Sequence, residues 1–277
     1  MARRRTDREP RSPQWSQRKM LTLLAGAGLA VAILAAGAVL AVVHAVHPAS
    51  KPSAAAVSAG SSAAVPIAGA ADRTPPEDAL AARLMPVVPE SAAHPGPVSD
   101  RDPGASIELP PATTAGPAGV PTGFPHTPEG ALAQLAAIDQ SALQSGSLVG
   151  ARAVIQEWAV PGGPTTTSWS GVRAMGALLD GTGLSGGGSA QFAVVLTPLM
   201  GQIKGSVGPD FVVPCVDFEL DVTLQQTARG AVADCQRMVW RTDRWLIGPG
   251  DEPAVPPSVW PDTDLAISVG YRDLRHG

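Results

Sequence analysis

Residues 215–224, CVDFELDVTL, alternate apolar and polar side chains along most of their length. A period of two is typical of a β-strand with one buried face and one exposed face. The apolar set is predicted to face a core and consists of Val216, Phe218, Leu220, Val222 and Leu224. The opposite set is predicted to form a solvated face and consists of Cys215, Asp217, Glu219 and Asp221.

The acidic face of this strand also resembles a cation site. We favour the solvated face, because carboxylates in a row along one strand point outward in parallel and do not converge on a hard ion. On the following strand, Arg237 and Arg241 have the same parity as Cys235. The two arginines are therefore expected to pair with the acids across the strands, which adds little stability on a surface.

A helix start lies well before this strand. Thr127 precedes Pro128 and Glu129, which places an N-cap hydroxyl before proline at the first helical position and a carboxylate in the first turn. Apolar residues at helical spacing then continue until Gly146.

Further elements follow in a clear order. Shorter helices are expected at 149–160 and 172–179, and strand patterns at 192–196 and 212–225. Helices first and strands afterwards predict an α+β domain, with N-terminal helices packed on a curved antiparallel sheet, over residues 122–277.

The N-terminal region predicts a membrane anchor. Residues 20–43 carry no charge and follow a tail with seven basic and two acidic residues. As a helix, 24 residues extend about 36 Å, which exceeds the ~30 Å hydrocarbon core of a bilayer. The basic tail predicts a cytoplasmic N-terminus. We therefore expect a cytoplasmic tail at 1–19, a single transmembrane helix at 20–46 and an extracytoplasmic C-terminal part, located at the cell membrane.

A cleaved signal peptide is the alternative reading of this region. Its apolar part would be only about 7 to 15 residues and would end at small residues. Here the run is longer, and His44 and His47 follow it. We favour a retained anchor.

A linker is predicted between the anchor and the domain, at 47–121. From residue 48 onward it contains 14 of the chain's 28 prolines, with much alanine, serine and glycine. Such a composition buries little apolar surface, so we expect a disordered spacer whose removal leaves the domain folded.

The charge distribution argues against nucleic-acid binding by the outer domain. The net charge is −4, and residues 122–277 hold nine basic and fifteen acidic residues. Nucleic-acid affinity comes mainly from lysine and arginine on phosphates. For the basic tail we expect contact with anionic lipid.

The cysteines, Cys215 and Cys235, both lie in the predicted exported domain. An oxidising compartment favours a disulfide between them. A tight turn at 228–230 would instead place Cys235 opposite Asp221, too far from its partner. We favour the bridge, with residues 223–229 as a looser loop.

No residues predict catalysis, a cofactor or a metal. His126 is the one histidine of residues 122–277 away from the C-terminus, and its place between two prolines predicts an exposed side chain. Gly183–Ser189 lacks the Lys-Ser/Thr ending of a phosphate loop. Tryptophans of an exported domain can line a carbohydrate or peptide groove, but for most of Trp158, Trp169, Trp240 and Trp245 we expect core positions.

The final predicted hairpin, RMVW at 237–240 and RWLI at 244–247, completes a pattern that resembles the cone-shaped fold shared by nuclear transport factor two and ketosteroid isomerase. With one N-terminal crossing, the chain is similar to bitopic scaffold proteins of type IV secretion and conjugation systems. Segments 123–131, 233–238 and 260–265 resemble membrane-anchored proteins of actinobacterial mobile elements.

The resemblance implies a scaffold and not an isomerase. Isomerase chemistry needs a buried acid as base and a polar oxyanion site, and the one tyrosine, Tyr271, lies near the C-terminus. We expect a non-enzymatic assembly component of a conjugation or secretion apparatus, which contacts lipid, other membrane or secretion-machine proteins, or copies of itself. The alternative is a membrane-anchored module that binds a ligand or the cell wall.

Overall fold

The computed structural model describes residues 74–277, so the predicted tail, the predicted transmembrane helix and the linker as far as residue 73 lie outside the described residues. Three helices, α3 (Pro128–Leu143), α4 (Leu148–Trp158) and α5 (Ser170–Gly181), precede the long strands. The main strands are β4 (Ala193–Val207), β5 (Phe211–Leu224), β6 (Gln226–Cys235), β7 (Met238–Arg241) and β8 (Arg244–Ile247).

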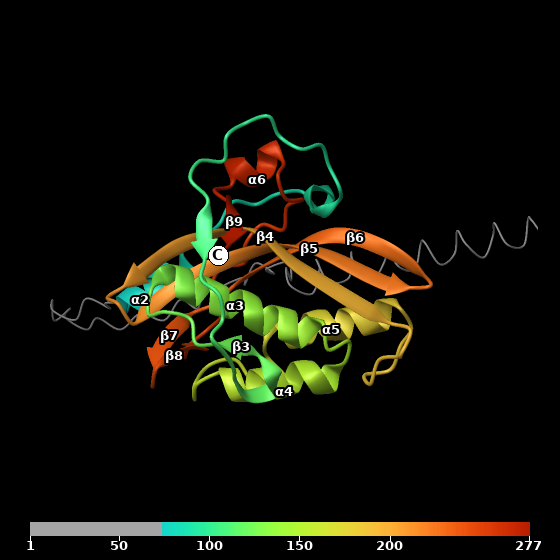
Figure 1. Cartoon of the computed structure of the whole chain (residues 1–277), viewed down its shortest axis with the longest axis horizontal. Coiled ribbons are helices and arrows are strands. Elements are labelled where there is room, and N and C mark those ends of the chain that lie inside the picture. The colour runs from blue at the N-terminus through green and yellow to red at the C-terminus, as the bar shows by residue number, and fades with distance from the viewer. Residues whose placement is uncertain (1–73) are drawn as a thin grey trace, which may run out of the picture.

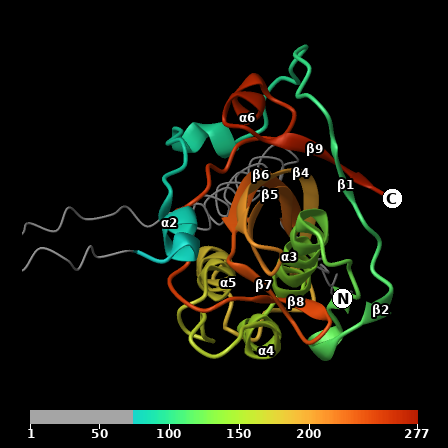
Figure 2. The ribbon, with the colours of Figure 1, turned by 90° about the vertical axis from the view of Figure 1, so that its left-hand side faces the viewer.

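The strands form one curled, mainly antiparallel sheet in the order β1-β9-β4-β5-β7-β8, with β6 also paired to β5. The strands β1 (Ile107–Leu109) and β9 (Arg272–His276) are parallel and form one edge. In Figures 1 and 2 the sheet curves over α3, with α4 and α5 on the same side. The predicted α+β class with a curved antiparallel sheet is confirmed.

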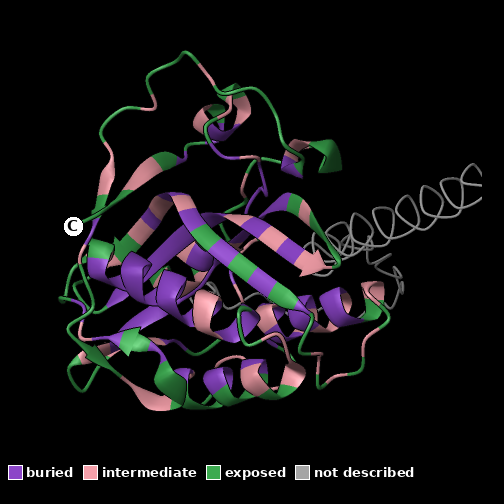
Figure 3. Cartoon of the chain, turned by 45° about the vertical axis from the view of Figure 1, so that its right-hand side comes forward, coloured by how far each residue is buried: buried purple, intermediate pink, exposed green. Residues whose placement is uncertain are grey.

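The predicted helix start at Thr127 is confirmed. The Thr127 hydroxyl accepts a hydrogen bond from the backbone N–H of Gly130 at 3.1 Å, and Pro128 occupies the first helical position. Twelve of the 16 residues of α3 are buried, because the helix lies between the curled sheet and the other helices (Figure 3). The other two helices lie within two residues of their predicted bounds.

The predicted solvated face of β5 is wrong for Cys215 and Asp217, whereas the side chains of Glu219 and Asp221 remain 16% and 33% exposed. Cys215 and Asp217 have 0% of their surface exposed. A second hydrophobic cluster covers this face, with Val259, Ala266 and Tyr271 contributed by the segment after β8. Figure 1 shows that segment, with α6 (Asp264–Ser268), across the sheet from α3. Both faces of β5 are therefore buried near Cys215 and Asp217, where the alternation separates two hydrophobic clusters.

The predicted disordered linker is wrong for residues 74–121. This stretch contains the helices α2 (Pro76–Ala82), η1 (Glu90–Ala93) and η2 (Pro117–Gly119), and the strands β1, β2 (Thr114–Ala115) and β3 (Pro121–Thr122). Several of its apolar residues pack on the domain, and Leu109 and Val120 are buried in the main core. Composition alone misses this, because a segment poor in apolar residues can be ordered by a surface that other residues supply.

The helix α2 is fixed by charged groups of the sheet. Arg237 donates to the Asp78 carboxylate at 2.6 Å, and the Lys204 ammonium donates to the carbonyl of Ala81 at 2.8 Å. The Arg237 side chain is 8% exposed and that of Asp78 is 45% exposed. Burial, and then the nearby Arg83, lower the pKa of Lys204 to about 8.

The β5–β6 hairpin turns at Gln225, whose φ is +73°. The turn lies neither at 228–230 nor in a loop over 223–229, so that expectation is wrong. The register places Cys215 directly opposite Cys235, with Cα atoms 4.1 Å apart, and a disulfide joins them.

The expected pairing of Arg237 and Arg241 with the acids of β5 is also wrong. Arg229 forms the ion pairs with Glu219 and Asp221, because the observed register places it directly opposite Asp221. Arg241 donates to the carbonyl of Trp240 at 2.9 Å.

Candidate functional site

A small pocket lies between the helices and the concave face of the sheet. Its volume is about 30 Å3. The helices α3 and α5 and the strands β4, β5 and β6 supply its walls. The lining residues are Asp139, Leu143, Ser170, Gly171, Ala174, Leu196, Phe218, Val232, Ala233 and Asp234.

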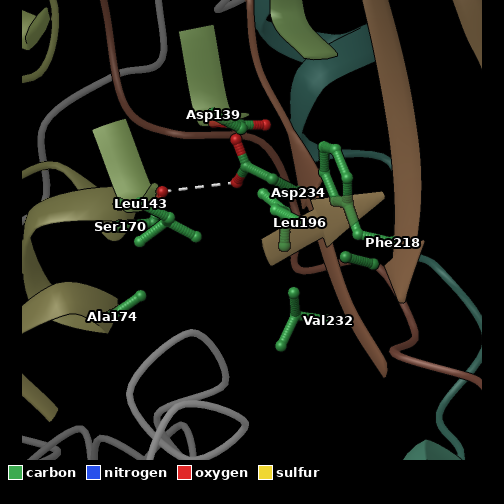
Figure 4. A pocket seen from close by; sticks show the side chains of 10 residues that line it. Asp139, Leu143, Ser170, Ala174, Leu196, Phe218, Val232 and Asp234 are labelled. Atoms are coloured by element: carbon green, nitrogen blue, oxygen red, sulfur yellow. Dashed lines mark hydrogen bonds between the residues drawn. The ribbon is translucent and has the colours of Figure 1, made fainter. Parts of the chain in front are cut away.

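Two carboxyl groups meet at the polar end of this pocket. Asp139 extends from α3 and Asp234 from β6, and the two side chains point toward one another (Figure 4). Asp139 is 4% exposed, and its Oδ2 atom has no hydrogen-bond partner. Burial raises the pKa of Asp139 well above its ordinary value, and the charges of Asp234 and Glu252 raise it further. The carboxyl of Asp139 is therefore protonated more readily than in water.

Two side chains donate hydrogen bonds to Asp234, in addition to the backbone of Cys235. The Ser170 hydroxyl donates at 3.3 Å, drawn as the dashed line in Figure 4, and the Gln236 amide donates at 2.9 Å. These bonds favour the ionised form, but burial and the charge of Glu252 outweigh them and raise the pKa of Asp234 to about 7. Asp234 thus changes charge near neutral pH.

Glu252 connects this pocket to the segment after β8. Its carboxylate accepts the backbone N–H of Ser170 at 2.7 Å and pairs with Arg173 at 3.0 Å. Trp169 occupies the N-cap of α5 without a side-chain cap, so Glu252 supplies the missing acceptor from outside the helix. Within residues 74–277, Arg173 is the one basic side chain beside Asp139, Asp234 and Glu252, and it pairs with Glu252.

A second group of side chains lies at the β7–β8 hairpin. The His126 ring stacks on Trp240 with centroids 4.3 Å apart, and its Nε2 lies 2.8 Å from an Asp210 oxygen and 3.0 Å from the Pro209 carbonyl. Both neighbours are acceptors, so Nε2 carries the proton. His126 is exposed, as predicted. The site is a surface contact between two loops and contains no pocket-lining residue.

The predicted core positions are confirmed for Trp158, Trp169 and Trp245, each with 0% of its surface exposed, whereas Trp240 is only partly buried. Gly183–Ser189 lies in the connection between α5 and β4 and is not part of the pocket.

The sequence prediction missed Asp139, Asp234 and Glu252. The one signal in the sequence was Asp139, an acid within the apolar repeat of a helix. The register of the β5–β6 hairpin and the path of the chain after β8 decide which acids lie near it, and neither follows from local patterns.

Within residues 74–277, no three or more metal-ligating side chains are grouped so that they could hold an ion. Over the same residues, no helix combines the length and the apolar composition needed to cross a bilayer.

The chain has no match among protein-family models, among curated proteins or among solved structures.

Proposed function

We propose that this chain is a non-enzymatic, membrane-anchored assembly component of a conjugation or secretion apparatus, with a cone-shaped outer domain. The uncharged stretch at 20–43, the basic tail before it and the resemblance of the hairpin segments support the proposal. The α+β class and the curled sheet agree with the outer domain that the resemblance implies.

One surface feature carries the assembly role. Residues 83–89 run between α2 and η1 and expose Leu84 and Val87, at 87% and 98% of their surface. In the same segment Met85 and Val88 pack against the second hydrophobic cluster. The segment is thus held on its inner side and presents apolar side chains outward, as a protein contact surface does.

The alternative is a membrane-anchored module that binds a ligand or the cell wall, and the size of the pocket argues against a small-molecule ligand. Pockets that bind small molecules usually have about 300 to 1,000 Å3. The carboxyl pocket has about 30 Å3, which leaves no room for a ligand of metabolite size. We therefore place the contacts that define this protein on its surface.

Site-specific crosslinking in cells tests the proposal. A photoreactive amino acid replaces Leu84 or Val87 in the full-length chain, and crosslinked proteins are identified by mass spectrometry after irradiation of the native membrane. Val149 on α4, 71% exposed, is the matched control position. We expect a transfer ATPase or channel subunits from positions 84 and 87 but not from position 149. Recovery of wall-synthesis proteins, of no protein, or of the same proteins from position 149 contradicts the proposal.

A further inference from the structure

Residues 83–89, RLMPVVP, join α2 to η1 with an extended backbone along the outside of the domain (Figure 2). Within residues 74–277, positions 84–88 make no backbone–backbone hydrogen bond. At the two ends of the segment, Arg83 has φ −56° and ψ 120°, and Pro89 has φ −67° and ψ 150°. A proline fixes its own φ near −65° and disfavours the helical region for the residue before it. The segment therefore has the features of a polyproline II helix, which contains no internal hydrogen bonds.

The burial of the side chains repeats every three residues, which is the period of a polyproline II helix. Met85 and Val88 pack against the second hydrophobic cluster. Leu84 and Val87 form an exposed row, at 87% and 98% of their surface. A second exposed row, the prolyl row, consists of Arg83, Pro86 and Pro89. A β-strand would instead alternate every two residues.

The exposed rows indicate the chemistry of the surface that recognises them. Proteins bind polyproline II segments in grooves lined by aromatic side chains. The exposed side chains from residue 84 to residue 89 contain no polar atom, so they match such a groove and offer a glycan no hydrogen bond. Because the domain already holds the segment extended, binding costs little ordering entropy.

Arg83 adds a positive charge at one end of the prolyl row. Its guanidinium donates to the carbonyl of Lys204, which fixes it beside the segment. Within residues 74–277, no carboxylate pairs with Arg83. The side chain is exposed and has further N–H donors, so a carboxylate on the partner would complement it.

We propose that residues 83–89 are a polyproline II ligand that docks into an aromatic-lined groove of a partner protein, with a carboxylate of that protein beside Arg83. The inference rests on the proposed function, because it takes this segment as the protein contact surface. It goes further by stating which kind of site the partner presents.

Crosslinking in cells tests the ligand. A photoreactive amino acid at position 84 of the full-length chain captures the partner in the native membrane, and mass spectrometry identifies the protein and the residue of attachment. The variant Pro86→Ala/Pro89→Ala keeps Val87 but removes both rings and the fixed backbone. It should lower the yield of the crosslink at least about fivefold. Pro95→Ala/Pro97→Ala, at two exposed prolines between η1 and β1, is the control and should keep the yield.

A charge reversal tests the other half of the proposal. Arg83→Glu should also lower the yield severalfold, because it opposes the carboxylate of the partner. Arg101→Glu, at an exposed arginine of the same region, is the matched control and should keep the yield. Thermal melting of each full-length variant shows whether the domain is folded. If the variant at positions 86 and 89 does not fold, the residue of attachment and Arg83→Glu decide.

The outcomes separate this inference from the assembly role. Capture of a secretion-apparatus subunit beside aromatic side chains, with the yield lost in Pro86→Ala/Pro89→Ala, supports both. Capture of such a subunit with an equal yield in that variant, or at a surface without aromatic side chains, overturns the ligand and leaves the assembly role. Proline-dependent capture of a wall-synthesis protein supports the ligand and overturns the assembly role. Attachment to lipid or glycan, or capture of no protein, overturns both.

Discussion

Asp139 of α3 and Asp234 of β6 point toward one another in the interior of the domain (Figure 4). Water solvates carboxylates far better than the apolar walls of this pocket do, so their ionisation opposes folding. The pair therefore couples the stability of the domain to its protonation.

The stability of the domain should fall as the pH rises from about 5 to 8. The folded pKa values of Asp139, Asp234 and Asp217 lie above the unfolded value of 3.8, so the native state binds more protons in this range. Their stabilisation is present at low pH and is lost as the pH passes the folded pKa. For Asp234 alone, with a folded pKa of about 7, the loss is at most about 2 to 3 kcal/mol. Urea unfolding at several pH values measures it.

Asp139→Asn is the matched variant for the pH measurement. The groups that face this carboxyl are Asp234 and Glu252, with Arg173 bound to Glu252. Removal of Asp139 should flatten the pH dependence of the unfolding free energy, because its raised pKa no longer contributes. A wild-type protein that becomes more stable from pH 5 to 8 would contradict the assignment.

Reduction of the disulfide should lower the unfolding free energy by about 3 kcal/mol, the loop-entropy value for a bridge that spans 20 residues. Cys215 and Cys235 are at most 2% exposed, so reductant acts slowly on the folded protein. Melting with and without dithiothreitol, after long incubation, measures the effect. Cys215→Ala/Cys235→Ala should melt at one temperature under both conditions. A wild-type protein that is insensitive to complete reduction argues against a stabilising bridge.

The ion pair between Arg237 and Asp78 should hold α2 on the sheet. Asp78→Ala leaves a buried guanidinium without its carboxylate, which should cost about 1 to 3 kcal/mol. Limited proteolysis should then cleave near α2 sooner than in the wild type. Asp100→Ala, an exposed aspartate of the same N-terminal region, is the control and should change neither quantity. Equal cleavage rates in both variants would show that the other contacts of α2, among them the hydrogen bond from Lys204 to Ala81, hold it without the ion pair.

Local sequence patterns predicted which helices and strands form. They predicted less well which segments pack against each of them. The alternation from Val216 to Leu224 and the cap at Thr127 each depend on neighbouring residues, and both elements formed as predicted. Burial of Asp217 depends on where the segment after β8 lies, which no pattern in β5 contains. The Asp139–Asp234 pair likewise depends on a turn at Gln225, a residue without a strong turn preference.

The Pro-rich region offers the sharpest test of how far the folded domain extends. Deletion of residues 74–121 from the full-length chain removes Leu109 and Val120 from the main core, and each buried side chain contributes about 1.5 to 3 kcal/mol. It also removes the Pro117 carbonyl that accepts from the Trp158 indole at 3.1 Å. The summed loss is a large share of the roughly 5 to 15 kcal/mol that stabilises a typical domain, so we expect unfolding or aggregation. Deletion of residues 48–73 is the control, and because it keeps every contact described for residues 74–277, melting should be unchanged. If both shortened chains melt like the wild type, the contacts of residues 74–121 contribute little and the domain is complete without them.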